Sequence, residues 1–414
     1  MDYELFGRLI NKMSNPLAQK NIILGVTGSI AAYKACELAS KLTQAGSNVN
    51  VILTESALKF VSALSFQSVT GKKAYTDIDL WGGEGHVTHI GLGHSADLLV
   101  IAPISANTLA KLANGIGDNL LSVTALAANC PTILAPAMDG GMYSHPATQK
   151  NIDILKSRGV NFVGPESGHL ASGLSGEGRF ADPKNIFENI NYLFSRSGKL
   201  EKKKVVVTAG ATREDIDPVR FITNRSSGKQ GYAIANACMN EGADVVLITG
   251  KTRLPKPYGC KIIEIGSADE MLKAVLSEIN DADILFMAAA VSDFKPEVIS
   301  KEKIKKTSSF QNINLQSTED ILKVVAKYKQ ASGYPRITVG FAAESQDLHT
   351  NAKKKLREKD LDFIIANDIT ATNAGFEVNT NKVTIYFQDG NVIDLPNMSK
   401  QEVAEFIVQK AINL

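Results

Sequence analysis

The sequence predicts an α/β protein with two doubly wound, mostly parallel, Rossmann-like sheets. Short apolar runs alternate with helical segments along nearly the whole chain, as in parallel sheets whose strands are joined by crossover helices. Two such series begin alike, with a buried strand, a Gly-containing loop and a helix. Between them, at 196–203, hydrophobic periodicity lapses and charge rises, which is typical of a linker. We therefore predict domains at 1–195 and 204–414.

The first series opens with "NIILGV" (21–26), a continuous apolar run that predicts a buried strand. The loop Thr27-Gly28-Ser29 follows, and the Ala- and Leu-rich segment 31–44 predicts a helix that stops at Gly46. The same criteria predict the remaining elements of this half, which are strands 48–53, 97–102, 132–136 and 161–164 and helices 55–63, 105–114 and 146–158.

The second series opens with the strand "KVVVT" (204–208), and a helix is expected over 227–240. The Asp389-Gly390 pair predicts a hairpin between strands 382–387 and 391–395, because both residues readily adopt the positive φ of a tight turn. The other expected elements are strands 244–249, 283–288, 337–341 and 362–366 and helices 268–279, 348–359 and 399–412.

Composition argues against several classes of protein. The 414 residues suffice for two domains, and a hydrophobic content of 44% is ordinary for a globular protein. A net charge of +2 without a long basic block gives no support for a nucleic-acid partner, and no apolar run approaches the roughly 18 residues of a membrane span. The four cysteines lack a C-x-x-C pair, so disulfides and structural zinc are not expected. The sequence therefore favours a cytoplasmic protein.

The stretch "FITNRSSGKQGY" (221–232) contains Ser-Gly-Lys at the expected start of a helix, which suggests phosphate binding. A P-loop needs Gly five residues before its Gly-Lys pair and Ser or Thr directly after it. These two positions hold Thr223 and Gln230, so the stretch is not a P-loop.

The loop Thr27-Gly28-Ser29 lies where open α/β sheets bind ligands, after a strand and before a helix N-terminus. It lacks the full G-x-G-x-x-G spacing, so the single phosphate of a mononucleotide is favoured over a dinucleotide. A tight turn in which Ser29 caps the helix explains the loop equally well.

Three further segments, "HVTHIGL" (86–92), "PISANT" (103–108) and "PAMDGGMY" (136–143), resemble in order and spacing the motifs of the flavin-dependent cysteine decarboxylase family. The resemblance covers about the first 190 residues, a domain-sized stretch, and implies a homo-oligomeric, flavodoxin-like flavoprotein fold. It implies that FMN binds here, with its phosphate near Ser29 and its ring near the second and third motifs. The implied FMN-binding residues are Gly28, Ser29, Thr54, Ser105, Ala106, Asn107 and Met138.

The implied chemistry is oxidation of a C-terminal-type cysteine moiety by the flavin, loss of CO₂ from the thioaldehyde, and return of the electrons. His89 is the implied catalytic base, a role that suits imidazole near neutral pH. The segment "SGHLASGLSGEGRF" (167–180) matches the mobile substrate clamp of the family, to which Ser172, Ser175 and Arg179 belong.

Two positions depart from the family pattern. Asp139 replaces the usual Asn of the P-x-M-N motif and puts an anion where a substrate carboxylate is expected. Either Asp139 is protonated or a cation compensates, and Arg179 is the candidate cation. Ser172 stands where many relatives carry Cys, and Ser175 is again Ser, so this chain lacks a thiol there for the final reduction step.

The second half closely resembles phosphopantothenoylcysteine synthetase. The segments that carry the resemblance are "AGATRE" (209–214), "DPVRFITNRSSGKQGYAIA" (217–235), "AAAVSDF" (288–294), "KEKIKK" (301–306), "VGFAAE" (339–344), "KKKLREK" (353–359) and "IIANDI" (364–369). With the first half, they identify the chain as a member of the bifunctional coenzyme A enzymes, which join phosphopantothenate–cysteine ligase to phosphopantothenoylcysteine decarboxylase. The resemblance implies CTP-dependent ligation of cysteine to 4′-phosphopantothenate through an acyl-cytidylate, and then FMN-dependent decarboxylation to 4′-phosphopantetheine.

The resemblance also implies roles in the ligase. Asn224 would offer amide donors to the oxyanion as cysteine attacks the acyl-cytidylate. Residues 226–229 would supply amides and charge for the phosphate or acyl end of phosphopantothenate, and Lys303 would contact the transferring phosphate. Mg²⁺ is expected with CTP, because negative charge develops on the phosphates, but no metal ligand is identified. The implied CTP-binding residues are Ala289, Asp293, Lys303, Phe341, Lys355 and Lys359.

Two other functions stay open. An active ligase joined to a drifted, regulatory flavoprotein would explain Asp139 and Ser172. Another flavin enzyme of the same fold, such as a prenyltransferase, is disfavoured by the attached ligase domain. The expected partners are the small-molecule substrates and further copies of the chain, as trimers of the first domain and dimers of the second, without nucleic acid or membrane.

Overall fold

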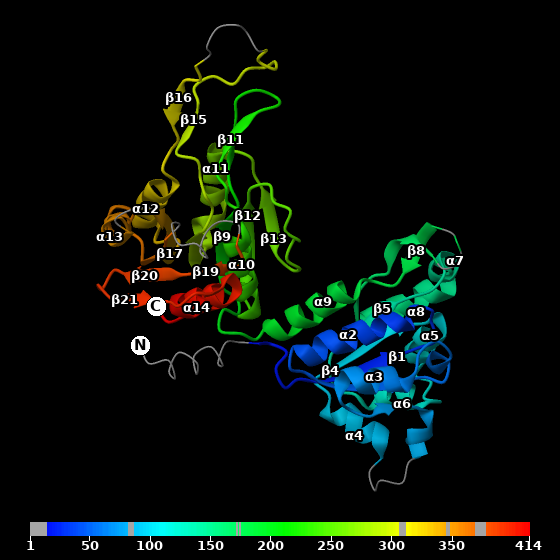
Figure 1. The fold of residues 1–414 in the computed structure, drawn as a ribbon. Helices are drawn as coiled ribbons and strands as arrows, with labels where there is room; N and C mark the ends of the chain where they lie inside the picture. The colour runs from blue at the N-terminus through cyan, green and yellow to red at the C-terminus, as the bar shows by residue number, and fades with distance from the viewer. Residues whose placement is uncertain are drawn as a thin grey trace. The chain divides into compact units, whose positions relative to one another are not determined.

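The computed structural model describes residues 15–81, 87–170, 173, 175–305, 312–344, 348–368 and 378–414. The chain divides into two compact units, Asn15–Phe194 and Ser195–Leu414, whose helices and strands are labelled in Figure 1. In these ranges no helix is both long enough and apolar enough to cross a membrane.

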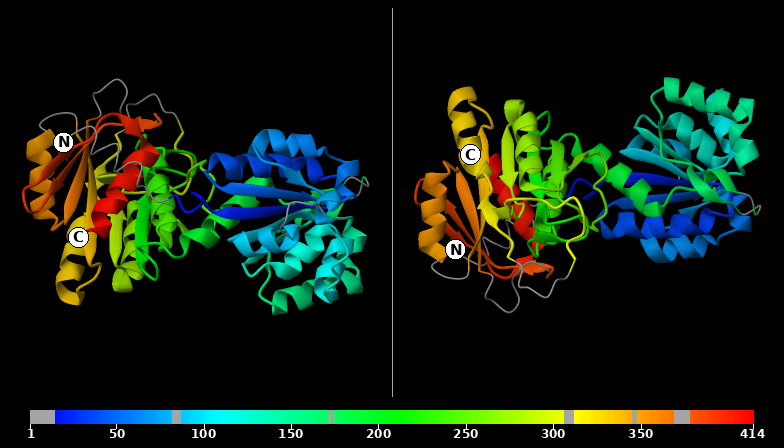
Figure 2. Two further views of the ribbon diagram at one scale, coloured as in Figure 1. Left: turned by 90° about the horizontal axis from the view of Figure 1, so that it is seen from below. Right: turned by 90° about the horizontal axis from the view of Figure 1, so that it is seen from above.

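The first unit contains a six-stranded parallel sheet in the order β3-β2-β1-β4-β5-β6. Helices cover both faces of this sheet (Figure 2), which explains why its central strands are continuous apolar runs. The strands are β1 (Asn21–Val26), β2 (Asn48–Leu53), β3 (Ala74–Tyr75), β4 (Leu98–Ile104), β5 (Thr132–Pro136) and β6 (Asn161–Phe162).

Helices of the first unit bury apolar side chains along one face, as α2 (Ala32–Gln44) illustrates. In α2, which joins β1 to β2, Ala35, Leu38, Ala39 and Leu42 recur every three or four residues and pack in one cluster with Leu24 of β1. A hairpin of β7 (Glu166–His169) and β8 (Ser175–Arg179) stands apart from the sheet. The helices are α2 (Ala32–Gln44), α3 (Ala63–Thr70), α4 (Thr88–Ser95), α5 (Ala106–Asn114), α6 (Leu120–Ala127), α7 (Gly140–Ser144), α8 (Pro146–Ser157) and α9 (Pro183–Ser195).

The predicted helix over 55–63 is wrong. Only Ala57–Lys59 forms a single 3₁₀ turn, after which Ser62 takes up extended backbone. The Ser62 side chain accepts a hydrogen bond from the backbone N–H of Leu64 at 3.2 Å and so caps α3. Gly71, with φ of 67°, ends that helix. The capping residues therefore place the helix at 63–70 and not before it.

The second unit contains an eight-stranded sheet in the order β13-β12-β9-β14-β17-β18-β20-β21. The first six strands are parallel to one another, β20 pairs antiparallel with β18, and β21 pairs antiparallel with β20. Both units therefore confirm the predicted doubly wound, mostly parallel α/β class. The strands are β9 (Lys204–Ala209), β12 (Asp244–Thr249), β13 (Lys261–Glu264), β14 (Ile284–Met287), β17 (Ile337–Glu344), β18 (Phe363–Asp368), β20 (Val383–Phe387) and β21 (Val392–Asp394).

The predicted Asp389-Gly390 hairpin is confirmed. Gly390 has φ of 91°, and the backbone N–H of Phe387 donates to the carbonyl of Asn391 at 3.0 Å, which closes the turn between β20 and β21. Three shorter antiparallel pairs were not predicted. They are β10 (Arg213–Asp215) with β11 (Phe221–Thr223), β15 (Phe294–Pro296) with β16 (Leu315–Ser317), and β19 (Thr380–Asn381) with β22 (Met398–Ser399).

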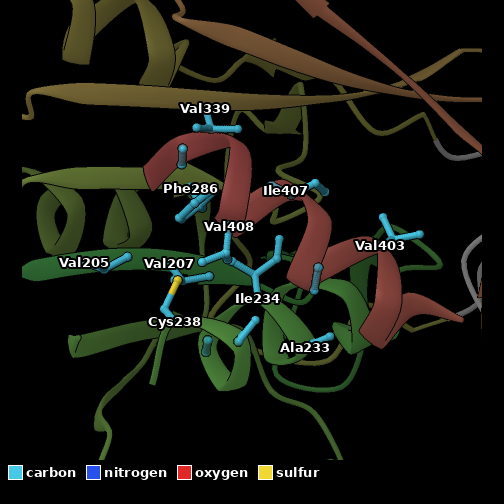
Figure 3. Packing of buried hydrophobic residues seen from close by; sticks show 14 of the residues in the cluster. Val205, Val207, Ala233, Ile234, Cys238, Phe286, Val339, Val403, Ile407 and Val408 are labelled. Atoms are coloured by element: carbon cyan, nitrogen blue, oxygen red, sulfur yellow. The ribbon is translucent and has the colours of Figure 1, made fainter. Parts of the chain in front are cut away.

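One face of the second sheet is covered by α10 (Lys229–Asn240) and α14 (Lys400–Ile412), which lie side by side (Figure 3). Their apolar faces pack against central strands of the sheet, among them β9 and β14. The cluster includes Val205, Val207, Ile234, Cys238, Phe286, Ile407 and Val408. The other helices of the unit are α11 (Ala268–Glu278), α12 (Ile321–Ser332) and α13 (Leu348–Glu358).

Residues 196–203, the expected linker, pack against the second unit. Leu200 is 4% exposed and belongs to the same core cluster as Val205. Its backbone N–H donates to the carbonyl of Glu241 at 2.7 Å. Gly198 lies so close to Glu241 that a Cβ there would overlap the Glu241 backbone. This segment is thus held by specific contacts.

Candidate active sites

In the first unit, the strand order reverses between β1 and β4, and this is where open α/β sheets form a ligand crevice. The Thr27 hydroxyl is buried between the loops that follow these two strands. It donates to the carbonyl of Pro103 at 2.9 Å and accepts from the N–H of Ser105 at 2.9 Å. Thr27 therefore holds the two predicted FMN loops together.

The loop after β1 offers a place for a phosphate group. Ala31, the N-cap of α2, provides no side-chain cap, so N–H groups in the first turn and the positive end of the helix dipole face the loop. Ser29 lies beside them and accepts from the N–H of Ala31 at 3.3 Å. A Cβ on Gly28 would lie 2.6 Å from the Cβ of Ser56, so this approach requires glycine. These groups fit the phosphate of a mononucleotide such as FMN.

Other residues predicted to bind FMN have local structural contacts as well. The buried Thr54 hydroxyl accepts from the N–H of Ala57 at 3.3 Å and shapes the turn after β2. Ser105 caps α5 by accepting from the N–H of Thr108 at 3.3 Å. Ala106 and Asn107 begin that helix, and the Asn107 side chain is exposed.

A cavity of about 330 Å³ brings Ser29, Met138, Asp139 and Arg179 together. The N–H of Met138 donates to the carbonyl of Gly178 at 3.0 Å, which joins the loop after β5 to β8. Asp139 caps α7 by accepting from the N–H of Gly141 at 2.9 Å. The cation proposed to compensate Asp139 therefore lines the same cavity. His169 of β7 also lines it and was not predicted, although it belongs to the clamp segment.

Three predicted residues are placed elsewhere or not described. His89 lies on α4 and does not line this cavity, and its buried Nδ1 has no hydrogen-bond partner among the described residues. Ser175 is exposed at the start of β8, where it pairs with His169. Ser172 lies outside the described residues.

In the second unit, a cavity of about 570 Å³ gathers most residues predicted for the ligase. They come from the loop before α10, the segment after β14, the middle of β17 and the end of α13. The predicted residues that line the cavity are Asn224, Ser226, Ser227, Gly228, Lys229, Ala289, Asp293, Phe341, Lys355 and Lys359.

Buried polar groups fix the loops around this cavity. The fully buried hydroxyls of Thr208 and Thr212 accept from the N–H groups of Ala289 and Ser292 at 3.1 and 3.0 Å. The Asn224 side chain donates through Nδ2 to the carbonyl of Ala290 at 3.1 Å. The loop before α10 and the segment after β14 are thus held against each other.

The cavity is rich in cationic groups. Lys359 forms an ion pair with Asp320, with an Nζ–O distance of 3.2 Å, and both residues line the cavity with Lys355. Gly228, the N-cap of α10, has φ of 79° and no side-chain cap, so N–H groups at that helix start remain for an anion. In the described ranges no group of three His, Cys, Asp or Glu side chains is placed to hold a metal ion.

Comparison with known proteins covers both halves of the chain. The family model "DNA/pantothenate metabolism flavoprotein C-terminal domain" matches residues 200–414, and the model "Flavoprotein" matches residues 10–195. The chain is 47% identical over 397 residues to coenzyme A biosynthesis bifunctional protein CoaBC of Bacillus subtilis (strain 168), with 95% of this chain and 97% of the relative covered. The chain belongs to this bifunctional family.

A more distant family member, from Vibrio parahaemolyticus serotype O3:K6 (strain RIMD 2210633), is 39% identical over 394 residues, with 95% of this chain and 98% of the relative covered. Among solved structures, the C-terminal domain of a coenzyme A biosynthesis bifunctional protein CoaBC is 40% identical and covers 52% of this chain and 97% of its own, with a TM-score of 0.44. The family assignment rests on the full-length relatives and on the matches of both domains.

Lys303, the family residue expected on the transferring phosphate, is exposed and does not line the cavity. The next residue, Ile304, is anchored at both of its backbone groups. Its N–H donates to Oδ2 of Asp217 at 3.2 Å, and its carbonyl accepts from Nη2 of Arg220 at 3.0 Å. Arg220 also lowers the pKa of Asp217 through their hydrogen bonds, so this anchor is charged.

Several cavity residues were not predicted, and four of them carry buried polar groups. Gln230, Asn367 and Asn381 each have a buried side-chain oxygen without a hydrogen-bond partner in the described part of the chain. The fourth is Lys400, which is only 7% exposed. Burial, and then repulsion by Lys229, lowers the pKa of Lys400 from 10.5 to about 8. No motif marks Lys400, because it simply begins the last helix.

Replacing Lys400 with Met is expected to stabilise the protein at pH 7. The folded state holds the charged amine less well than the unfolded chain does, so the unfolded state binds more protons between pH 8 and 10.5. Wild-type stability should therefore rise with pH across that window, and this rise should be absent from Lys400→Met. Urea unfolding at pH 7, 8, 9 and 10 measures both effects. A less stable variant at pH 7 would contradict the expectation.

Proposed function

We propose that this chain catalyses two consecutive steps of coenzyme A biosynthesis. Residues 204–414 ligate cysteine to 4′-phosphopantothenate with CTP through an acyl-cytidylate, and residues 1–195 decarboxylate the product to 4′-phosphopantetheine with FMN. The observation that carries the proposal is the convergence of Asn224, Asp293, Phe341 and two lysines on one cavity in a chain that matches the bifunctional relatives over 95% of its length.

Activation of the pantothenate carboxylate needs cations. Negative charge develops on the α-phosphate and on the leaving pyrophosphate as the carboxylate attacks CTP. Lys355 lies in the last turn of α13, and Lys359 directly follows the helix with its N–H bonded to the carbonyl of Lys355 at 3.1 Å, so both side chains are placed for the phosphates. Mg²⁺ enters with CTP in this proposal, and Lys303 is assigned to the transferring phosphate by the family resemblance alone.

Asn224 serves the second half of the ligase reaction. Its Nδ2 atom carries two N–H bonds, and one of them donates to the carbonyl of Ala290. The other N–H is available for the oxyanion that forms when the cysteine amine attacks the acyl carbon. Because the first bond fixes the amide, this donor needs no reorganisation during the reaction.

The first domain binds FMN in this proposal. Ser29 and the start of α2 hold its phosphate, and the residues around Ser105 and Met138 hold its ring. Bound FMN supplies the two-electron acceptor and donor that protein side chains lack. Arg179 binds the substrate carboxylate beside Asp139 and offsets the charge of that residue, and His89 takes a proton as general base.

Assembly of several copies completes the decarboxylase site. His89 does not line the cavity of its own chain, and exposed apolar side chains lie near it in the sequence, including Ile78 and Trp81, each 88% exposed. Trimers of the first domain would bury this surface and bring His89 to a neighbouring cavity. Dimers of the second domain are proposed as well.

A regulatory first domain is the second candidate. Asp139 caps α7 and faces the cavity in place of the family Asn, so the site has changed at a position that meets the substrate. In that case the ligase would be active while the flavoprotein half would bind FMN without releasing CO₂.

A coupled assay tests both candidates. Purified protein receives CTP, cysteine and 4′-phosphopantothenate, and the release of pyrophosphate, CMP and CO₂ is measured. Equal amounts of the three products support the bifunctional enzyme. CMP without CO₂, in a protein that absorbs as a flavoprotein, supports the regulatory first domain. No CTP-dependent product at all would refute the proposed function.

Replacing Lys355 with Gln is expected to lower kcat/KM for CTP by about 10- to 100-fold, as for the loss of one charge-assisted hydrogen bond. Decarboxylation of supplied phosphopantothenoylcysteine should not change, because the two cavities belong to different domains. Lys354→Gln is the matched control, since Lys354 is exposed on the same helix and outside the cavity. Equal loss of both activities in Lys355→Gln would contradict two independent sites.

A further inference from the structure

The last step of the decarboxylase reaction adds a proton to carbon. Loss of CO₂ leaves an ene-thiolate, in which a double bond joins the carbon that carried the carboxylate to the carbon that carries sulfur. A proton added to the first carbon turns the second into a thioaldehyde. The two electrons removed in the oxidation step then return to the second carbon as a hydride, and the saturated thiol forms without net oxidation. This step therefore requires an acid in the cavity of the first domain.

Five ionisable side chains of the described residues line that cavity. They are Tyr33, Lys34, Asp139, His169 and Arg179. Phenol, ammonium and guanidinium groups ordinarily hold their protons up to about pH 10 or above, which makes them poor acids at neutral pH. A carboxyl group ordinarily loses its proton at about pH 4 and then has none to give. Imidazole is the group that both carries a proton and releases it near neutral pH. Elementary acid strength therefore selects His169.

His169 is placed beside the group that binds the substrate carboxylate. It is the last residue of β7, and Arg179 is the last residue of β8 in the same hairpin. A Cβ on Gly168 would lie 3.0 Å from Nη1 of Arg179, so the guanidinium group lies against the residue that precedes His169. Arg179 holds the carboxylate on the carbon that loses CO₂. His169 is thus close to the carbon that must receive the proton.

Backbone contacts hold this hairpin against the loop after β5. The N–H of Met138 donates to the carbonyl of Gly178, which has φ of 143°. A Cβ on Gly178 would lie 2.4 Å from the carbonyl oxygen of Met138, so only glycine permits this approach. Leu170, which follows His169, is 8% exposed and lines the same cavity. His169 itself is exposed, so water can restore its proton after each turnover.

We propose that His169 is the proton donor of the final step of the decarboxylase. Its imidazolium group gives a proton to the carbon that has lost CO₂. The electrons of the carbon–carbon double bond form the new C–H bond, and a lone pair of the thiolate sulfur forms the C=S bond. Ser175, which pairs with His169 across the hairpin, carries a hydroxyl and no ionisable group. This inference rests on the proposed decarboxylase function.

Anaerobic single-turnover reactions test the inference. FMN-loaded protein receives one equivalent of phosphopantothenoylcysteine, and CO₂, ene-thiol, saturated thiol and flavin absorbance are followed together. In His169→Gln, CO₂ release should match the wild type, whereas formation of the saturated thiol should fall by about 10²- to 10⁴-fold. The ene-thiol should then accumulate while the flavin stays reduced. His94→Gln, at an exposed position in the last turn of α4, is the control and should behave as the wild type.

Three further measurements distinguish proton donation from a structural role. In His169→Ala, added imidazole should restore formation of the saturated thiol. The FMN affinity of the His169→Gln apoprotein should equal that of the wild type. The imidazole NMR signal of His169, identified by its absence from FMN-loaded His169→Gln, should shift when the product 4′-phosphopantetheine is added to the FMN-loaded wild type.

Several results would overturn the inference. Saturated thiol formed by His169→Gln at the wild-type rate would show that another group donates the proton. Loss of CO₂ release in that variant would assign His169 to an earlier step or to the cofactor. An NMR signal of His169 that does not respond to the product would place the residue outside the site. A wild type that binds FMN but releases no CO₂ would refute the proposed decarboxylase, and the inference with it.

Discussion

Replacing His89 with Asn is expected to reduce CO₂ release by about 10²- to 10⁴-fold, the usual effect of removing a general base. The protein should stay yellow. His89 lies on α4 and does not line the cavity of Ser29 and Met138 in its own chain, so loss of the imidazole leaves the phosphate and ring contacts of FMN in place. Asn keeps a polar side chain of similar length but has no basic nitrogen.

The measurement pairs flavin absorbance with CO₂ release from supplied phosphopantothenoylcysteine. His94→Asn is the matched control, because His94 is exposed in the last turn of the same helix. It should retain both the flavin and the activity. A colourless His89→Asn protein would mean that His89 serves the fold or the cofactor and not the proton transfer.

Replacing Asn224 with Asp is expected to slow cysteine attack by about 10²- to 10³-fold and to let acyl-cytidylate accumulate. The change removes both N–H donors of the amide. It also turns a carboxylate oxygen toward the carbonyl of Ala290, which now accepts from Nδ2 at 3.1 Å, and this repulsion adds to the lost oxyanion contact. Activation by CTP depends on the lysines and should continue.

Mass spectrometry of quenched reactions detects the acyl-cytidylate directly. Asn280→Asp, at an exposed position of the same domain, controls for the added charge. If Asn224→Asp fails to form the adduct because CTP is not consumed, Asn224 acts in the first half-reaction instead.

The central strands were predictable because burial on both faces leaves continuous apolar runs. The bounds of β1, β2 and β12 agree with the sequence prediction at both ends. Three-residue strands such as β10 and β11 carry no period long enough to recognise. The helix predicted over 55–63 is wrong because Ser62 and Gly71 cap a helix that spans 63–70 instead.

Site residues at the ends of parallel strands were foreseeable for a topological reason. Parallel strands deliver their following loops to one edge of a sheet, so the loops of Ser29, Ser105 and Met138 must meet. Lys400 could not be found in this way. It reaches the cavity only because β19 and β22 pair, and neither two-residue strand has a sequence signal.

The packing of α14 over β9 constrains when the second domain can fold during synthesis. Val205 and Val207 of its first strand share a cluster with Val403, Ile407 and Val408 of its last helix. On the ribosome, that strand stays uncovered until residues 400–412 have emerged, so its native contacts form only as translation ends. The flavoprotein half is one continuous stretch that precedes the second domain in the chain. All of its strands are therefore synthesised before those of the second domain. The nascent chain therefore carries a folded first domain and an aggregation-prone second one, and chaperones would bind the latter.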